Sequence, residues 1–512
     1  MQDKKVYLVW VCFYKRIMST ISKPEFTGWR ALFWPIHNHE LKKFIPLALI
    51  MCCILFNYTV FRNTKDTLIL TSAGAGTITF LKMYCVMPIA ILFVILYAKM
   101  SNVFNPEKIF YATMIPFLVF FALFAFVINP NISTLHPSAE TVANLIAANP
   151  RFEGFIKIYA NWGYSLFFVM AELWGSMMLS LSFWQFANQI TRMTEAKRFY
   201  GLFVVVANLA TILSGCAVSV CSKLAKNITP EGGDEWQWTL TTLMCITIIV
   251  GIMCLAIYKW MYKNVLSDPK YYDGPKESKK KSKPGLIESA KIVFTSPELG
   301  LIALLIIAYG VTINLVEVQW KHQVKLLFGT DKVAMNSFMG MYSAWTGVAT
   351  IIFALFFGSN ILRRFGWFFS AAFTPFVILT FGSTFFLFVF CKELVASLME
   401  NPVYAAAIVG AIVVIASKAV KYCLFDPTKE MAYIPLEQEL KTKGKAAVDV
   451  IGGRLGKSAG AFTQTILFII FATTDVVTIA PIASGAFVLM CVVWFYAVKA
   501  LSKRLKTIDS NI

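Results

Sequence analysis

Long apolar stretches recur along most of this sequence, and short polar segments separate them. A helix needs about 20 apolar residues to cross the hydrocarbon core of a membrane, and there every backbone polar group must bond internally. The alternating ten-residue pattern of membrane β-barrel strands is not seen. The pattern predicts an all-α, polytopic membrane protein with transmembrane helices at residues 44–70, 79–98, 109–128, 161–189, 199–222, 238–258, 298–322, 335–359, 367–390, 403–430, 458–474 and 477–498.

Composition adds one question, because the 512 residues carry a formal net charge of +19. Basic residues on the cytoplasmic side of a membrane protein are expected from the positive-inside rule. If the amino terminus is cytoplasmic, the cytoplasmic segments contain 33 of the 47 Lys and Arg, the opposite loops contain 7 and the spans contain 7. We therefore predict that both termini are cytoplasmic and that the charge reflects orientation, not binding to nucleic acid.

The longest basic segment divides the twelve predicted spans into two sets of six. It contains the run Lys279-Lys280-Lys281. The predicted organisation is an amino-terminal cytoplasmic segment at 1–43, a six-helix bundle at 44–258, a basic cytoplasmic linker at 259–297, a second six-helix bundle at 298–498 and a cytoplasmic tail at 499–512.

A faint internal repeat relates the two bundles. Asn57–Arg62 in the first span matches Asn314–Gln319 in the seventh, 257 positions later. The expected cytoplasmic turn Thr194–Arg198 matches Thr442–Ala446, 248 positions later. Similar offsets at the same span numbers predict parallel repeats, the arrangement of major-facilitator transporters.

Charged residues lie inside several predicted spans, where a charge at the membrane centre costs about 2.5–3.5 kcal/mol. In a parallel-repeat carrier the first, fourth, seventh and tenth spans line a central cavity, and these spans contain most of the charges. An excess of Lys and Arg there attracts an anion and binds phosphate. Two other interpretations stay open: the charges pair across helices only to fix packing, or some cations reach the outer surface along their flexible stems. The cations concerned by the second interpretation are Arg62, Lys65 and Lys82.

We interpret most of these polar residues as substrate ligands. The candidate substrate-binding residues are Arg62, Lys65, Lys82, Glu172, Asn188, Glu317, Lys321, Lys421 and Lys429. The candidate gating or structural charge pairs involve Asp66, Asp426 and Glu430, and Lys418 is a further charge of the tenth span. Aromatic residues of the fourth span are candidates for stacking on a purine: Trp174, Phe183, Trp184 and Phe186.

No catalytic, metal or cofactor site is predicted, and we expect a protein that is not an enzyme. The 11 Cys and 4 His are scattered and form no CxxC pair. Gly452–Ser458 resembles a P-loop, but only three residues separate its first Gly from the Gly-Lys pair, where the motif has four. We expect a cytoplasmic turn there instead of an ATP-hydrolysing site.

Several long polar motifs inside spans resemble the nucleotide (ATP:ADP) translocases of obligate intracellular bacteria and plastids. They are Phe61–Leu68, Ala171–Ser176, Glu195–Tyr200, Lys421–Leu436 and Lys443–Ala447, and the resemblance runs from about residue 33 to the end of the twelfth span. It implies exchange of ATP for ADP by alternating access or, alternatively, proton-coupled uptake of nucleotides. The family's functional charges match Lys82, Glu172 and Glu317, with Lys429, or else Lys421, as the fourth.

The implied partners are the nucleotides ATP and ADP and the lipid bilayer, and we expect a monomer. A plastid member would carry a long transit peptide rich in Ser and Arg. The amino-terminal segment here is short and contains several acidic residues, so a bacterial inner membrane is favoured over a plastid envelope. An anion pore is the remaining rival, although charges of both signs suit alternating access better.

Overall fold

The computed structural model describes residues 30, 34–272, 296–391, 393, 396–397, 399–437 and 445–510. Within these residues every regular element is a helix, which confirms the all-α prediction. The basic run at 279–281 and most of the predicted linker lie outside the described residues.

Eleven helices of the described ranges are long and apolar enough to cross a membrane. The eleventh predicted span, 458–474, coincides with a shorter apolar stretch at Ser458–Ile470, so the number twelve stays a prediction. The eleven are Asn38–Ser72, Ala75–Tyr97, Pro106–Ile128, Trp162–Ile190, Arg198–Ile228, Glu235–Asn264, Pro297–Phe328, Lys332–Phe357, Arg364–Phe390, Pro402–Met431 and Val476–Thr507.

We call the helices before the linker the N-half and those after it the C-half. The N-half contains η1 (Asn38–Glu40), α3 (Leu41–Ser72), α4 (Ala75–Phe80), η2 (Leu81–Val86), α5 (Met87–Val103), α6 (Pro106–Leu123), η3 (Phe124–Ile128), α7 (Ile132–Leu135), α8 (Ala139–Ala148), η4 (Pro150–Phe152), α9 (Glu153–Ala160), α10 (Trp162–Trp174), η5 (Gly175–Phe183), α11 (Trp184–Ile190), α12 (Met193–Ile228) and α13 (Glu235–Asn264). The C-half contains α15 (Pro297–Phe328), α16 (Lys332–Phe353), η6 (Ala354–Gly358), α17 (Ser359–Phe390), α19 (Pro402–Val420), η7 (Lys421–Phe425), α20 (Asp426–Met431), α21 (Lys445–Ile470) and α22 (Val476–Ser510).

Large buried aromatic side chains join the helices within each half. In the N-half, Phe61 of α3 stacks on Phe121 with ring centroids 3.7 Å apart and meets Trp174 of α10 edge-on. The indole nitrogen of Trp174 donates to the carbonyl oxygen of Ile54 at 3.0 Å. Because buried rings contribute a large apolar area and the indole N–H is satisfied, α3 and α10 are held in one register.

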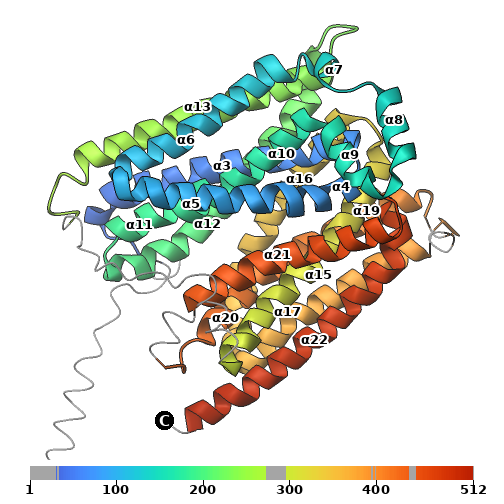
Figure 1. Ribbon diagram of the computed structural model, residues 1–512. Helices are drawn as coiled ribbons and strands as arrows, with labels where there is room; N and C mark the ends of the chain where they lie inside the picture. The colour runs from blue at the N-terminus through green and yellow to red at the C-terminus, as the bar shows by residue number, and fades with distance from the viewer. Residues whose placement is uncertain are drawn as a thin grey trace, which may run out of the picture.

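The two halves pack together mainly through α12 and α16. A Cβ on Gly215 would lie 2.5 Å from the carbonyl oxygen of Gly340, so only glycine permits this backbone approach. Small residues allow helices in membranes to come close enough for good van der Waals contact. The halves also converge at the end that carries α4, α9 and the α21–α22 connection, and in the view of Figure 1 they separate toward their other ends.

Glu153 of α9 connects the halves at this converging end. Its carboxylate accepts from the backbone N–H of Thr474 at 2.9 Å and from the Thr474 hydroxyl at 2.8 Å. Lys157 donates to the same hydroxyl at 2.7 Å and pairs with Glu153 at 2.7 Å. A Cβ on Gly76 would lie 2.3 Å from the carbonyl oxygen of Thr474, so α4 closes tightly over this contact.

Two expected turns are helical. Residues 194–198 form the beginning of α12, because Glu195 accepts the backbone N–H of Arg192 at 2.9 Å and pairs with buried Lys43 at 2.7 Å. Gly452–Ser458 lies inside α21, where Gly456 meets α15. A Cβ on Gly310 would lie 2.4 Å from the carbonyl carbon of Gly456, so Gly456 lies where α21 packs closely against α15. Both expectations of a turn were wrong.

Candidate substrate site

Six predicted charges from three helices form one chain of alternating sign. In order of contact they are Glu172, Lys65, Asp66, Lys321, Glu317 and Arg62. Glu172 lies on α10. Arg62, Lys65 and Asp66 lie on α3, and Glu317 and Lys321 lie on α15. With three cations and three anions, the chain is electrically neutral.

The middle of the chain crosses from one half to the other. Lys65 contacts Glu172 at 3.0 Å and Asp66 at 2.8 Å. Asp66 also contacts Lys321 of the C-half at 2.8 Å. Lys321 continues to Glu317 at 3.6 Å, four residues earlier on α15. One aspartate of α3 thus holds a cation from each half.

The end of the chain crosses back to the N-half, where Arg62 contacts Glu317 at 3.3 Å. Both end groups are partly accessible, with 27% of the Arg62 side chain and 26% of the Glu172 side chain exposed. Lys65, in contrast, is only 2% exposed and its ammonium group lies 3.9 Å from the centre of the Phe168 ring. The interpretation that Lys65 reaches the outer surface is therefore wrong.

Two further cations beside the chain have neutral partners in the described part of the protein. Lys82 of η2 donates to the amide oxygen of Asn314 at 3.3 Å, and Lys418 of α19 donates to the hydroxyl of Tyr342. Both are within electrostatic reach of Glu317. The neighbourhood of the neutral chain thus carries excess positive charge. The sequence placed Lys418 in a span, but nothing in it pointed to Tyr342.

π-helical segments contain two of the predicted site residues and begin close to a third. Lys82 is in η2, Glu172 stands just before η5, and Lys421 begins η7. Such segments within α-helices are frequent at functional sites, because they change the direction of side chains along the helix. No periodicity in the sequence had indicated them.

The other predicted charges form a second group on η7, α20 and the start of α21. Lys421 pairs with Asp426 at 2.8 Å, and Lys429 pairs with Glu430 at 3.2 Å. Glu430 also pairs with Lys445. These pairs lie within the C-half, and a gating role for Asp66, Asp426 and Glu430 stays a prediction.

Asn188 is not part of either group in the described residues. It is exposed on α11 and accepts a hydrogen bond from Tyr200 of α12. Its assignment as a substrate ligand therefore gains no support from the geometry.

The aromatic residues expected to stack on a purine are mostly buried in the N-half. Trp174, Phe183 and Phe186 belong to its core, so the stacking expectation was wrong for these three. Trp184, which is half-buried, meets Tyr200 edge-on.

Tyrosines closer to the charges are better placed to contact a base. Lys421 lies 4.4 Å from the ring centre of Tyr422 and 5.7 Å from that of Tyr309. The Tyr422 side chain is exposed. Two tyrosine rings of the C-half therefore border Lys421.

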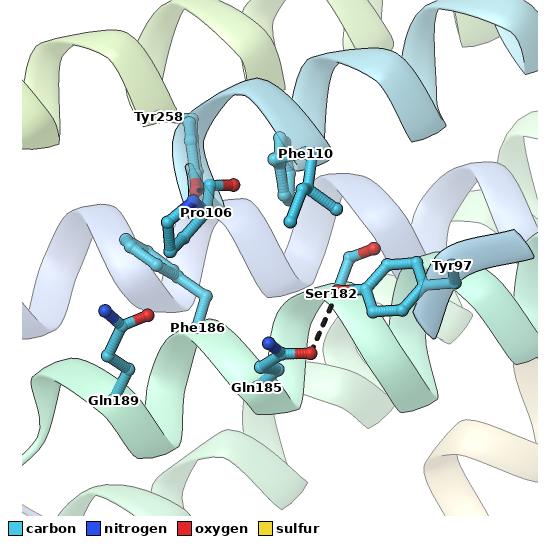
Figure 2. A pocket seen from close by; sticks show the side chains of 9 residues that line it. Tyr97, Pro106, Phe110, Ser182, Gln185, Phe186, Gln189 and Tyr258 are labelled. Carbon is cyan, nitrogen blue, oxygen red and sulfur yellow. Dashed lines mark hydrogen bonds between the residues drawn. The ribbon is translucent and has the colours of Figure 1, made fainter. Parts of the chain in front are cut away.

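Two hollows described in the structure lie elsewhere. Figure 2 shows a pocket of about 10 Å³, room for about one water molecule, in which Tyr97 donates to Gln185 at 3.0 Å. An apolar groove of about 670 Å³ lies between α17 and α22, with Phe386 and Phe487 in its lining. Neither contains a predicted site charge, so the argument for a substrate site rests on the ion chain.

A family described as TLC ATP/ADP transporter matches residues 19–505. The chain belongs to this family. An ADP,ATP carrier protein 1 of Chlamydia trachomatis is 45% identical over 496 residues, which cover 95% of this chain and 93% of that protein. The protein of the same name from Rickettsia bellii is 44% identical over 502 residues and covers 96% of this chain and 99% of its own.

Solved transporter structures confirm the major-facilitator-like fold of this TLC family member. The nucleoside transporter NupG superposes with a TM-score of 0.52 at 11% identity, covering 90% of this chain and 100% of that one. A D-xylose-proton symporter superposes with a TM-score of 0.51 at 12% identity, covering 88% and 97%. At these identities the likeness concerns the fold alone.

Proposed function

We propose that this membrane protein exchanges ATP for ADP across a bacterial inner membrane by alternating access, acting as a monomer and not as an enzyme. The carrier names of its bacterial relatives support the choice of nucleotides. The geometry adds the observation that carries the proposal. A neutral ion chain joins the two halves, and excess cations stand beside it.

The ion chain suits a carrier that must not reorient when empty. Glu317 engages Arg62 and Lys321, so the charges of the two halves satisfy one another. Phosphate oxygens form strong charge-assisted hydrogen bonds with Lys and Arg. A nucleotide that binds Arg62 and Lys82 competes with Glu317 for Arg62 and with Asn314 for Lys82. It thereby weakens the link between the halves and lets the loaded carrier rearrange.

The bundles at 44–258 and 298–498 are the moving units in this proposal. The excess of Lys and Arg on one side supports cytoplasmic termini. The end with α9 and the contact between Glu153 and Thr474 then faces away from the cytoplasm. Because the halves converge there and separate at the other end in Figure 1, we assign the described conformation to a state closed to the outside.

Counterflow in proteoliposomes tests this function. Vesicles containing the purified protein are loaded with ADP or left empty, and entry of labelled ATP is measured with and without a pH gradient. Exchange predicts fast entry only into loaded vesicles, whatever the gradient.

The rivals predict other results in the same vesicles. Entry into empty vesicles driven by the gradient would replace exchange with proton-coupled symport. Entry into empty vesicles that equilibrates without any gradient would indicate an anion pore. Either result contradicts exchange.

A further inference from the structure

We propose that Lys418 is a phosphate ligand contributed by the C-half, opposite Lys82 of the N-half, and that Tyr342 positions it. This inference rests on the proposed nucleotide exchange and adds a binding residue to it. Lys418 lies on α19 and its ammonium group donates to the Tyr342 hydroxyl on α16. The ammonium group also lies 4.9 Å from the centre of the Tyr342 ring.

The partner of Lys418 is fixed by packing in the C-half core. Tyr342 packs on Trp320 of α15, with ring centroids 4.6 Å apart. The indole nitrogen of Trp320 donates to the carbonyl oxygen of Ala407 at 2.9 Å. A Cβ on Gly410 would lie 2.4 Å from the Trp320 ring, so α19 lies directly against it. Three helices thus hold the tyrosine that holds Lys418.

Tyr342 orients the ammonium group without neutralising it. A phenol is uncharged near neutral pH, so Tyr342 supplies a hydrogen-bond acceptor to Lys418 and no formal charge. Its electrostatic neighbours include Arg62 and Lys321 as well as Glu317 and Asp66. Since the six-residue chain has no net charge and Tyr342 is neutral, Lys418 has no anionic hydrogen-bond partner among the described residues, and a bound anion would supply one.

Lys82 and Lys418 share three properties that suit one anionic ligand. Each hydrogen bonds to a neutral side chain, Asn314 for Lys82 and Tyr342 for Lys418. Both are within electrostatic reach of Glu317, and they belong to opposite halves. A polyphosphate has several negative oxygens and can engage both cations together, so the bound nucleotide would connect the halves through its phosphates.

The test measures exchange kinetics of Lys418→Gln, Lys418→Arg and Tyr342→Phe in proteoliposomes loaded with ADP. We expect Lys418→Gln to raise KM for ATP and for ADP about tenfold or more, which corresponds to one lost charged hydrogen bond. Lys418→Arg should stay within about threefold of the wild type, because it keeps the charge. Lys499→Gln removes an exposed lysine of α22 in the same half and is the matched control, expected to be unchanged.

A double variant separates positioning from general packing. If Tyr342 acts through Lys418, adding Tyr342→Phe to Lys418→Gln should raise KM little further, whereas independent effects would multiply. An unchanged KM in membrane-inserted Lys418→Gln, or a multiplicative double variant, would overturn the inference. If the Lys418→Gln protein cannot be purified from the membrane, Tyr342→Phe alone tests the inference, and an unchanged KM of Tyr342→Phe contradicts it. Absence of exchange by the wild type would instead remove the proposed function.

Discussion

Asp66 offers the sharpest test of the ion chain, because it holds a cation from each half at short distance and is almost completely buried. It contacts Lys65 and Lys321 at 2.8 Å each, and all three side chains are at most 2% exposed. At an effective dielectric constant of about 20, each contact is worth roughly 6 kcal/mol of Coulomb energy, much of it offset by desolvation. Removing one partner of a buried pair typically costs about 3–5 kcal/mol, because the remaining charge stays buried.

We therefore expect Asp66→Asn to destabilise the protein by about 3–5 kcal/mol. The assay is thermal unfolding of the purified protein in detergent. Asp426→Asn is the matched control: its pair with Lys421 has the same 2.8 Å distance, but 36% of the Asp426 side chain is exposed. Exposed pairs contribute about 0–1 kcal/mol, so the control should unfold near the wild-type temperature.

A compensating change sharpens the test. Adding Lys321→Gln to Asp66→Asn restores neutrality in the chain and should recover part of the lost stability. Equal unfolding temperatures for Asp66→Asn and Asp426→Asn would show that burial of the ion pairs of Asp66 does not determine their contribution to stability. That result would refute the prediction.

Three further predictions follow from the sequence and the contacts. Replacing Lys82, Lys421 or Lys429 by Gln should each weaken nucleotide binding by about 1.5–3 kcal/mol, measured by titration with the nucleotide. Unchanged affinity in all three variants would exclude phosphate contacts by these lysines. A single cysteine at position 280 should react with an impermeant reagent only from the cytoplasmic side, and labelling of intact cells from outside would contradict the topology. Burial raises the pKa of Glu153, but hydrogen bonds from Lys157 and Thr474 outweigh it, so the pKa lies below its ordinary value of 4.5. The stabilising contact between the Glu153 carboxylate and Thr474 should therefore be complete above pH 4.5 and be lost as the pH falls through the lowered pKa. The difference in stability between the wild type and Glu153→Gln should shrink in acid. A difference that stays constant with pH would argue against a role of the ionised carboxylate.

Local pattern was sufficient for the membrane helices. An apolar stretch can satisfy its backbone in lipid only by coiling, so the span predicted at 44–70 corresponds to α3 at Leu41–Ser72. The same reasoning identified the charges within spans as unusual, because a charge there requires a partner. It misjudged 194–198, where charged residues suggested a turn although Glu195 is buried against Lys43 in the folded protein.

Which charge meets which was decided only by tertiary structure. Asp66 and Lys321 are far apart in sequence, and their contact exists because α3 and α15 pack side by side between the halves. The neutral partner of Lys418 and the burial of Trp174 depend in the same way on helices from distant parts of the chain. Periodicity shows that a helix has a buried face, but the identity of the side chains opposite that face is set by the packing of the whole bundle, because every pair contact joins two separate helices.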